Sequence, residues 1–154
     1  MGHWAEIDEN DVVIRVLVMK EEELDTGNWG DKSNWIKTSY NTHEGKHYVP
    51  SDHQNWSEES PDQSKALRYR FAGAGYFYNR THDVFMTTVA PFPSWTVDTS
   101  TYNWVPPHNP DALSETQISQ GYYYTWDEDA YQADNTAGWV LRQTADQQPF
   151  DTTI

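Results

Sequence analysis

One short stretch of this sequence matches a catalytic metal motif. Residues 43–47 read His-Glu-Gly-Lys-His, the H-E-x-x-H pattern of zinc proteases, and His53 lies at the spacing of a third zinc ligand. This chemistry requires His43 and His47 on one face of a helix, so that both bind the metal while Glu44 acts as the general base. A helix over these residues would predict a small zinc metalloprotease.

Two residues in and after the motif oppose such a helix. Gly45 stands inside the would-be helix, where glycine costs about 1 kcal/mol relative to alanine. Pro50 takes the place of the glycine at which the longer form of the motif turns. Residues that favour strands flank the motif on both sides, so the segment is more typical of a β-hairpin.

A hairpin that turns at residues 44–45 separates the histidines. Its register pairs Thr42 with His47 and His43 with Lys46, which places the two histidines on opposite faces, where they cannot bind one metal ion. We therefore expect no metal at the three histidines of the motif, no cofactor and no enzymatic activity.

A second group of possible metal ligands lies near the C-terminal end. Asp127, Glu128, Asp129 and Asp134 offer the carboxylate oxygens that calcium prefers, but their spacing is not that of an EF-hand. We interpret them as solvated turn residues, and a weak divalent-cation site is the alternative.

Four copies of a short pattern indicate the elements that carry these residues. Each copy has an apolar residue, a spacer, a second apolar residue and then Asp or Asn, and the copies start at Ala5, Tyr76, Trp95 and Tyr124. In the first three copies a large apolar residue follows at the same offset from the start, and these residues are Ile14, Phe85 and Trp104. This spacing predicts β-hairpins.

Alternation along each strand predicts which side chains share a face. If Trp95 pairs with Trp104 across a turn near residues 99–100, then Val97 and Tyr102 lie with them on one apolar face. The opposite face of this hairpin is polar. We therefore expect the apolar face to be buried.

The other hairpins differ in how far the two faces are segregated. The N-terminal copy puts Ala5, Ile7, Val12 and Ile14 on one side, and only Val13 breaks the pattern. The second copy is apolar on both faces, so we expect it to be the most enclosed. In the last copy a long loop, 128–138, intervenes between the strands. The residues expected to form the core and the contacts with neighbouring subunits are Trp95, Val97, Tyr102, Trp104, Tyr76, Tyr78, Phe85, Trp126 and Trp139.

The remaining chain predicts little helix and several connectors. We expect one helical turn at 20–24, a strand at 35–40, an exposed loop at 50–64, and proline connectors at 91–93 and 106–107. The predicted fold is all-β, with consecutive antiparallel hairpins in a single domain over 1–142 and a polar tail over 143–154.

Composition limits the partners of this domain. The chain has 8 Trp, 10 Tyr and 5 Phe but few aliphatic residues, which predicts a thin aromatic core that neighbouring subunits help to complete. Its net charge of −14 opposes binding to nucleic acid or to an anionic membrane. We expect a soluble protein that the usual export route does not carry, because no signal peptide and no membrane-spanning stretch is evident.

Five segments in a fixed order carry a resemblance that covers roughly residues 4–140. In this order and spacing the chain resembles the small virion structural proteins of marine tailed bacteriophages, especially cyanophages. The resemblance implies a place in a virus particle and no catalytic chemistry. The segments are 5–10, 37–42, 71–76, 91–95 and 124–128.

The sequence and the resemblance together favour a non-enzymatic structural protein of the virion. We expect a multi-copy decoration or cement protein on the outer surface of the capsid, in contact with the major capsid protein or with tail proteins. A small, acidic, cysteine-free β protein suits such a surface subunit. The alternatives are a tail or tail-fibre accessory protein that binds host glycans, and the disfavoured zinc metalloprotease.

Overall fold

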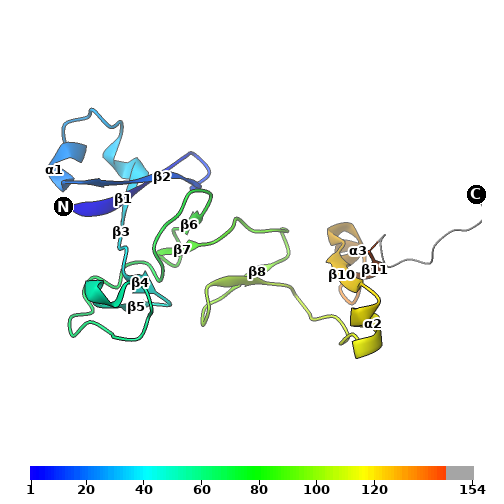
Figure 1. The fold of residues 1–154 in the computed structure, drawn as a ribbon. Coiled ribbons are helices and arrows are strands. Elements are labelled where there is room, and N and C mark those ends of the chain that lie inside the picture. The colour runs from blue at the N-terminus through cyan, green and yellow to red at the C-terminus, as the bar shows by residue number, and fades with distance from the viewer. Residues whose placement is uncertain (145–154) are drawn as a thin grey trace, which may run out of the picture. The chain divides into compact units, whose positions relative to one another are not determined.

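The computed structural model describes residues 1–144, and their contacts divide the chain into two compact units (Figure 1). Unit 1 consists of Met1–Pro91 and Val97–Trp104. Unit 2 consists of Phe92–Thr96 and the described residues from Val105 onward. Each unit is therefore described by itself.

A single domain over 1–142 stays a prediction. Gln143, the first residue of the expected tail, still belongs to a strand and pairs with Tyr122. The rest of the tail beyond Thr144 lies outside the described residues.

The predicted all-β fold is confirmed, because the described strands form small sheets and the helices are few and short. Unit 1 contains one three-stranded antiparallel sheet in the order β2-β1-β3. Its strands are β1 (Gly2–Ile7), β2 (Val13–Met19) and β3 (Trp35–Thr38). Two-stranded hairpins follow, formed by β4 (Thr42–His43) with β5 (Lys46–His47), and by β6 (Phe77–Asn79) with β7 (Val84–Met86).

The central strand β1 is buried on both faces. Trp4 packs with Met19 on one face, where the predicted helical turn α1 (Glu21–Leu24) adds the buried side chain of Leu24. Ala5 and Ile7 pack on the other face together with Phe85 of β7. These two aromatic-rich clusters form the core of unit 1.

A β-bulge in the first hairpin overturns the predicted faces of Val13 and Ile14. Glu6 pairs with Arg15 but Ile7 pairs with Val13, so Ile14 is an extra residue in β2. The bulge turns Val13 into the core, where it is 2% exposed, and leaves Ile14 53% exposed. The assignment of Ile14 to the buried face is therefore wrong, and Val13 takes its place.

The hairpin of β6 and β7 is the most enclosed, as expected. Tyr78 pairs with Phe85 and Phe77 pairs with Met86, so the hairpin is apolar on both faces, as predicted. All of β7 is buried, and Phe85 and Met86 are 0% exposed. Tyr76 packs at the edge of the same cluster.

The hairpin of β8 (Thr96–Asp98) and β9 (Asn103–Val105) closes through a tight turn. The backbone N–H groups of Thr101 and Tyr102 both donate to the carbonyl oxygen of Asp98, at 3.3 and 2.6 Å. Tyr102 adopts a left-handed φ of 49°, so it belongs to the turn and not to the strand.

This turn corrects the predicted register of the hairpin. The turn takes up residues 99–102, so the second strand begins at Asn103, two residues later than a turn at 99–100 predicts, and Trp95 lies before the first strand. The predicted pair of Trp95 with Trp104 is therefore wrong. Trp104 packs instead against Phe77 at 6.2 Å between ring centroids, and Tyr102 packs against Tyr69 at 4.8 Å.

The expectation of a plain exposed loop at 50–64 is partly wrong. The segment starts with the 3₁₀-helix η2 (Pro50–Asp52), and a second 3₁₀-helix, η1 (Lys32–Asn34), precedes β3. Asp52 is only 8% exposed, and its carboxylate accepts hydrogen bonds from Ser57 and from the backbone N–H of Glu58. These bonds hold the pKa of the Asp52 carboxyl below its ordinary value, although burial by itself would raise this pKa.

Unit 2 contains one hairpin, which the pattern at Tyr124 predicted, and two short helices, which were not predicted. The hairpin pairs β10 (Tyr122–Trp126) with β11 (Trp139–Gln143), and the helices are α2 (Glu115–Ser119) and α3 (Glu128–Ala133). A capping box between Ser114 and Gln117 begins α2, and this Ser-x-x-Gln signal is visible in the sequence.

Candidate interaction surface

An aromatic cluster forms the centre of unit 2. It consists of Trp95, His108, Trp126, Tyr131 and Trp139, and we call it the Trp126 cluster. The Trp126 ring lies 5.1 Å from Trp139, 5.3 Å from Tyr131, 5.5 Å from His108 and 6.2 Å from Trp95. Trp126 is 8% exposed, so these rings pack around it.

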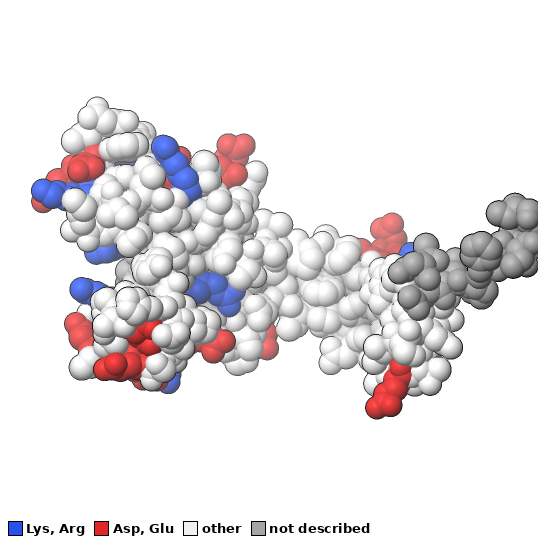
Figure 2. Space-filling model, in the orientation of Figure 1, with Lys and Arg blue, Asp and Glu red and all other residues white. Residues whose placement is uncertain are grey.

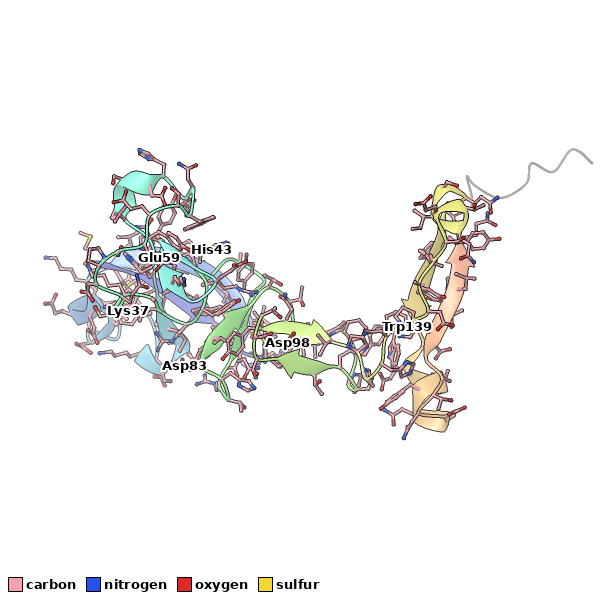
Figure 3. The ribbon with its side chains drawn as sticks, turned by 90° about the horizontal axis from the view of Figure 1, so that it is seen from below. Lys37, His43, Glu59, Asp83, Asp98 and Trp139 are labelled. Atoms are coloured by element: carbon pink, nitrogen blue, oxygen red, sulfur yellow. The ribbon has the colours of Figure 1, made fainter. Side chains whose placement is uncertain are left out.

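Three segments of the chain position these rings. The hairpin register places Trp126 opposite Trp139, which is labelled in Figure 3. Trp95 lies in the connector before β8 and contacts Trp139 at 6.1 Å. The third segment contains His108. The indole N–H of Trp139 donates to the carbonyl oxygen of His108 at 2.8 Å, which joins this segment to the hairpin. The Nε1 of Trp95 is buried and has no hydrogen-bond partner among the described residues.

The carboxylate of Glu128 links the cluster to α3. Its Oε1 accepts hydrogen bonds from Ser94 Oγ at 2.6 Å and from Trp126 Nε1 at 3.0 Å, and its Oε2 accepts from Gln132 at 2.7 Å. The bond from Ser94 is the largest cause that lowers the pKa of Glu128 from its ordinary 4.5 to about 2. The ionised form of Glu128 therefore stabilises unit 2.

Two other acidic residues of this loop, Asp127 and Asp134, also serve local structure. Asp127 caps α3 by accepting from the backbone N–H of Ala130 at 3.0 Å. Asp134 accepts from the backbone N–H and the hydroxyl of Thr136. Within residues 1–144 no three His, Cys, Asp or Glu side chains gather so that they could hold a metal ion.

The pKa of Glu128 predicts an acid-sensitive unit 2. Because the folded pKa lies below 4.5, the stabilisation is complete above pH 4.5 and is lost as the pH falls toward about 2. We expect the urea midpoint, followed through the indole resonances of Trp126 and Trp139, to fall over this range. Glu128→Gln should be less stable at pH 6 and should show a smaller fall. Equal falls in the two proteins would contradict this role.

The hairpin of unit 2 exposes apolar side chains on both faces. Tyr123 is 42% exposed and Leu141 is 44% exposed, and they lie on opposite faces because Leu141 pairs with Tyr124. The neighbouring helix α2 exposes Ile118 at 62%. Each strand also has one unpaired edge among the described residues. These features leave apolar side chains and strand edges of the hairpin exposed in the described part of the chain.

The histidine motif forms the predicted hairpin. Thr42 pairs with His47, and His43 pairs with Lys46, across a turn at residues 44–45. Both turn residues have positive φ, 47° and 81°, as a type I′ turn requires. The predicted register is therefore confirmed, and a zinc-binding helix is not formed.

The three histidines of the motif have separate surroundings. His47 is 7% exposed and its Nδ1 lies 2.7 Å from the Ser60 hydroxyl. His43 stacks on Trp56 on the other face of the hairpin. His53 follows η2 with a left-handed φ of 53°. The absence of bound zinc stays a prediction.

The predicted packing residues separate into two groups. Trp95, Trp126 and Trp139 meet in unit 2, whereas the other six belong to unit 1, where Val97 is half-buried. Sequence reasoning missed His108 and Tyr131 as members of the cluster. The Asp127 cap could have indicated the helix that carries Tyr131, but no local signal marks His108.

Comparison of this chain with family models, curated proteins and solved structures finds no match. Among the described helices, none is both long and apolar enough to cross a membrane.

Proposed function

We propose that this chain is a non-enzymatic structural component of a tailed bacteriophage particle, present in many copies on the outer surface of the capsid. Its partner there is the major capsid protein or another virion protein. The resemblance of its ordered segments to small virion proteins of marine phages supports this proposal, and so does the surface of unit 2.

The exposed hairpin of unit 2 is the observation that carries the proposal. An isolated two-stranded hairpin is marginally stable in water. This hairpin has Tyr123 and Leu141 exposed on opposite faces and an open edge on each strand. A neighbouring protein would cover these groups, as capsid assembly does for a surface subunit.

The charge of the chain supports an outer position. The described part of unit 2 has six acidic residues and one basic residue, Arg142. In unit 1 basic side chains are interspersed with acidic ones over the face shown in Figure 2. Contact with packaged DNA would set like charges within a Debye length of about 8 to 10 Å in every copy, and an outer position avoids this repulsion.

Purified particles of the encoding phage provide the test. Quantitative mass spectrometry should find this chain in a fixed, high ratio to the major capsid protein. Antibodies against the exposed residues 57–59 should label intact, DNA-filled particles. Only a few copies per particle would favour the tail accessory protein. Labelling that requires release of the genome, or absence from particles, would contradict the proposal.

A paired substitution tests the surface itself. Changing both Tyr123 and Leu141 to serine should reduce incorporation into particles about tenfold or more while the free protein stays folded, because the capsid contact loses two apolar anchors. Val89→Ser is the matched control, since Val89 is 47% exposed in unit 1 and should incorporate normally. Normal incorporation of the double variant would exclude this hairpin as the contact.

A further inference from the structure

A surface pocket of about 390 Å³ lies in unit 1, next to the histidine hairpin. This volume is within the range of small-molecule sites. The residues that matter for its chemistry are His43, Glu44, Gln54, Trp56, Arg70 and Asn103, and they come from four separate segments of the chain. The capsid proposal gives none of them a role.

Two stacked rings form one wall of the pocket. His43 and Trp56 lie 4.4 Å apart between centroids, with an angle of 9° between their planes. His43, labelled in Figure 3, is on β4, and Tyr48 supports the Trp56 ring at 5.4 Å. The carboxylate of Asp52 binds the backbone immediately after Trp56, so the wall is held in place from both sides.

The backbone that lines the pocket adopts unusual conformations. Glu44, Gln54 and Trp56 have left-handed φ values of 47°, 62° and 56°. Such conformations cost of order 1 kcal/mol or more for residues other than glycine, and they persist where the surroundings hold them. These backbone conformations bring Glu44 of the hairpin turn and Gln54 and Trp56 of the loop after η2 to one pocket.

The charge of Arg70 is not neutralised by any carboxylate among the described residues. Its Nη2 donates to the carbonyl oxygen of Thr101 at 3.1 Å, and its guanidinium lies 5.0 Å from the Tyr69 ring. Its Nη1 is buried and has no hydrogen-bond partner within residues 1–144. A buried donor without a partner is costly, and a planar guanidinium matches a carboxylate in shape and charge. Of the described residues that line the pocket, Arg70 is the one that carries a Lys or Arg side chain.

Glu44 limits what kind of anion the pocket accepts. Glu44 lines the same pocket as Arg70, its Oε1 lies 3.8 Å from His43 Nε2, and the chain as a whole carries a net charge of −14. A multiply charged phosphate would be repelled at the Glu44 end. A ligand with one negative charge, and with hydroxyl groups away from that charge, meets both residues favourably.

We propose that this pocket binds a sugar acid, that is, a monosaccharide unit bearing one carboxylate. The carboxylate pairs with Arg70, the hydroxyl groups bond to Gln54, Asn103 and Glu44, and the ring lies along the wall of His43 and Trp56. This binding site goes beyond the capsid role and does not depend on it.

Titration of the full chain with D-glucuronate tests the site by nuclear magnetic resonance. We expect a saturable shift of the Trp56 indole N–H resonance, which Trp56→Phe identifies. Arg70→Gln should weaken binding about tenfold or more, because a charge-assisted pair is lost. Arg80→Gln is the matched control: Arg80 lies 5.5 Å from the Tyr78 ring but outside the pocket, and its loss should leave binding unchanged.

Two further measurements keep the test decisive. D-Glucose and acetate carry only one half of the ligand's chemistry each, so both should bind at least about tenfold more weakly than D-glucuronate. If the Arg70→Gln protein unfolds, Asn103→Ala is tested in its place. Asn103 is exposed, so this variant should stay folded and should bind D-glucuronate more weakly. No saturable shift, equal binding of glucose or acetate, or undiminished affinity in the folded pocket variant would overturn the proposal.

Discussion

Replacing Trp126 by alanine is expected to remove a large part of the stability of unit 2. The side chain is 8% exposed and contacts four other rings of the Trp126 cluster. Truncation of a buried tryptophan costs about 3 to 5 kcal/mol, while whole domains are stable by only about 5 to 15 kcal/mol. The indole N–H bond to Glu128 is lost as well. Urea unfolding monitored by near-ultraviolet circular dichroism measures the change.

Tyr123→Ala is the matched control for this substitution. Tyr123 lies on the same strand as Trp126 but on the opposite face, and it is 42% exposed. We expect its free energy of unfolding to change by less than about 1 kcal/mol. If both variants unfold like the wild type, Trp126 is not the centre of this unit. If only Trp126→Ala unfolds early, and unit 1 resonances remain, the two units fold separately.

Gly138→Ala should be nearly as damaging, for a different reason. A Cβ at this position would lie 2.5 Å from Cζ3 and Cη2 of the Trp126 ring, and the backbone φ is +128°, which side chains rarely allow. The ring is packed by its neighbours and cannot withdraw. Overpacking together with backbone strain is expected to cost about 2 to 5 kcal/mol. The unfolding midpoint in urea measures it.

Gly27→Ala separates the steric effect from the conformational one. Gly27 also has a positive φ, +79°, but a Cβ there would meet nothing within 4 Å. Its substitution should therefore cost only about 1 kcal/mol. Equal destabilisation by the two alanines would show that the contact with Trp126 contributes nothing.

Local sequence signals were sufficient to predict those hairpins whose pairing depends only on neighbouring residues. The register of residues 42–47 followed from a two-residue turn, because Glu44-Gly45 allows only one way to pair the flanking strands. The enclosed faces of Tyr78 and Phe85 followed from alternation along β6 and β7. In both cases the determining residues are within a few positions of each other, so the sequence alone specified the geometry.

Where one inserted or turn residue shifts the register, the same reasoning failed. The extra residue Ile14 left the core and Val13 took its place, while Ala5 and Ile7 kept the predicted face. In the next case Tyr102 joined the turn and not the strand. A shift of one residue moves a side chain to the other face of its strand. Packing against the rest of unit 1 decides between such registers, and the hairpin sequence does not contain that information.

The sequence by itself determined the class of fold, the histidine hairpin and the aromatic character of the core. Only the tertiary structure decided which rings meet: Trp95 joins Trp126 and Trp139, and His108 completes their cluster. It also decided that Arg70 shares a pocket with the stacked ring of Trp56. These contacts join segments far apart in the chain, and their energy comes from packing that no local pattern of residues encodes.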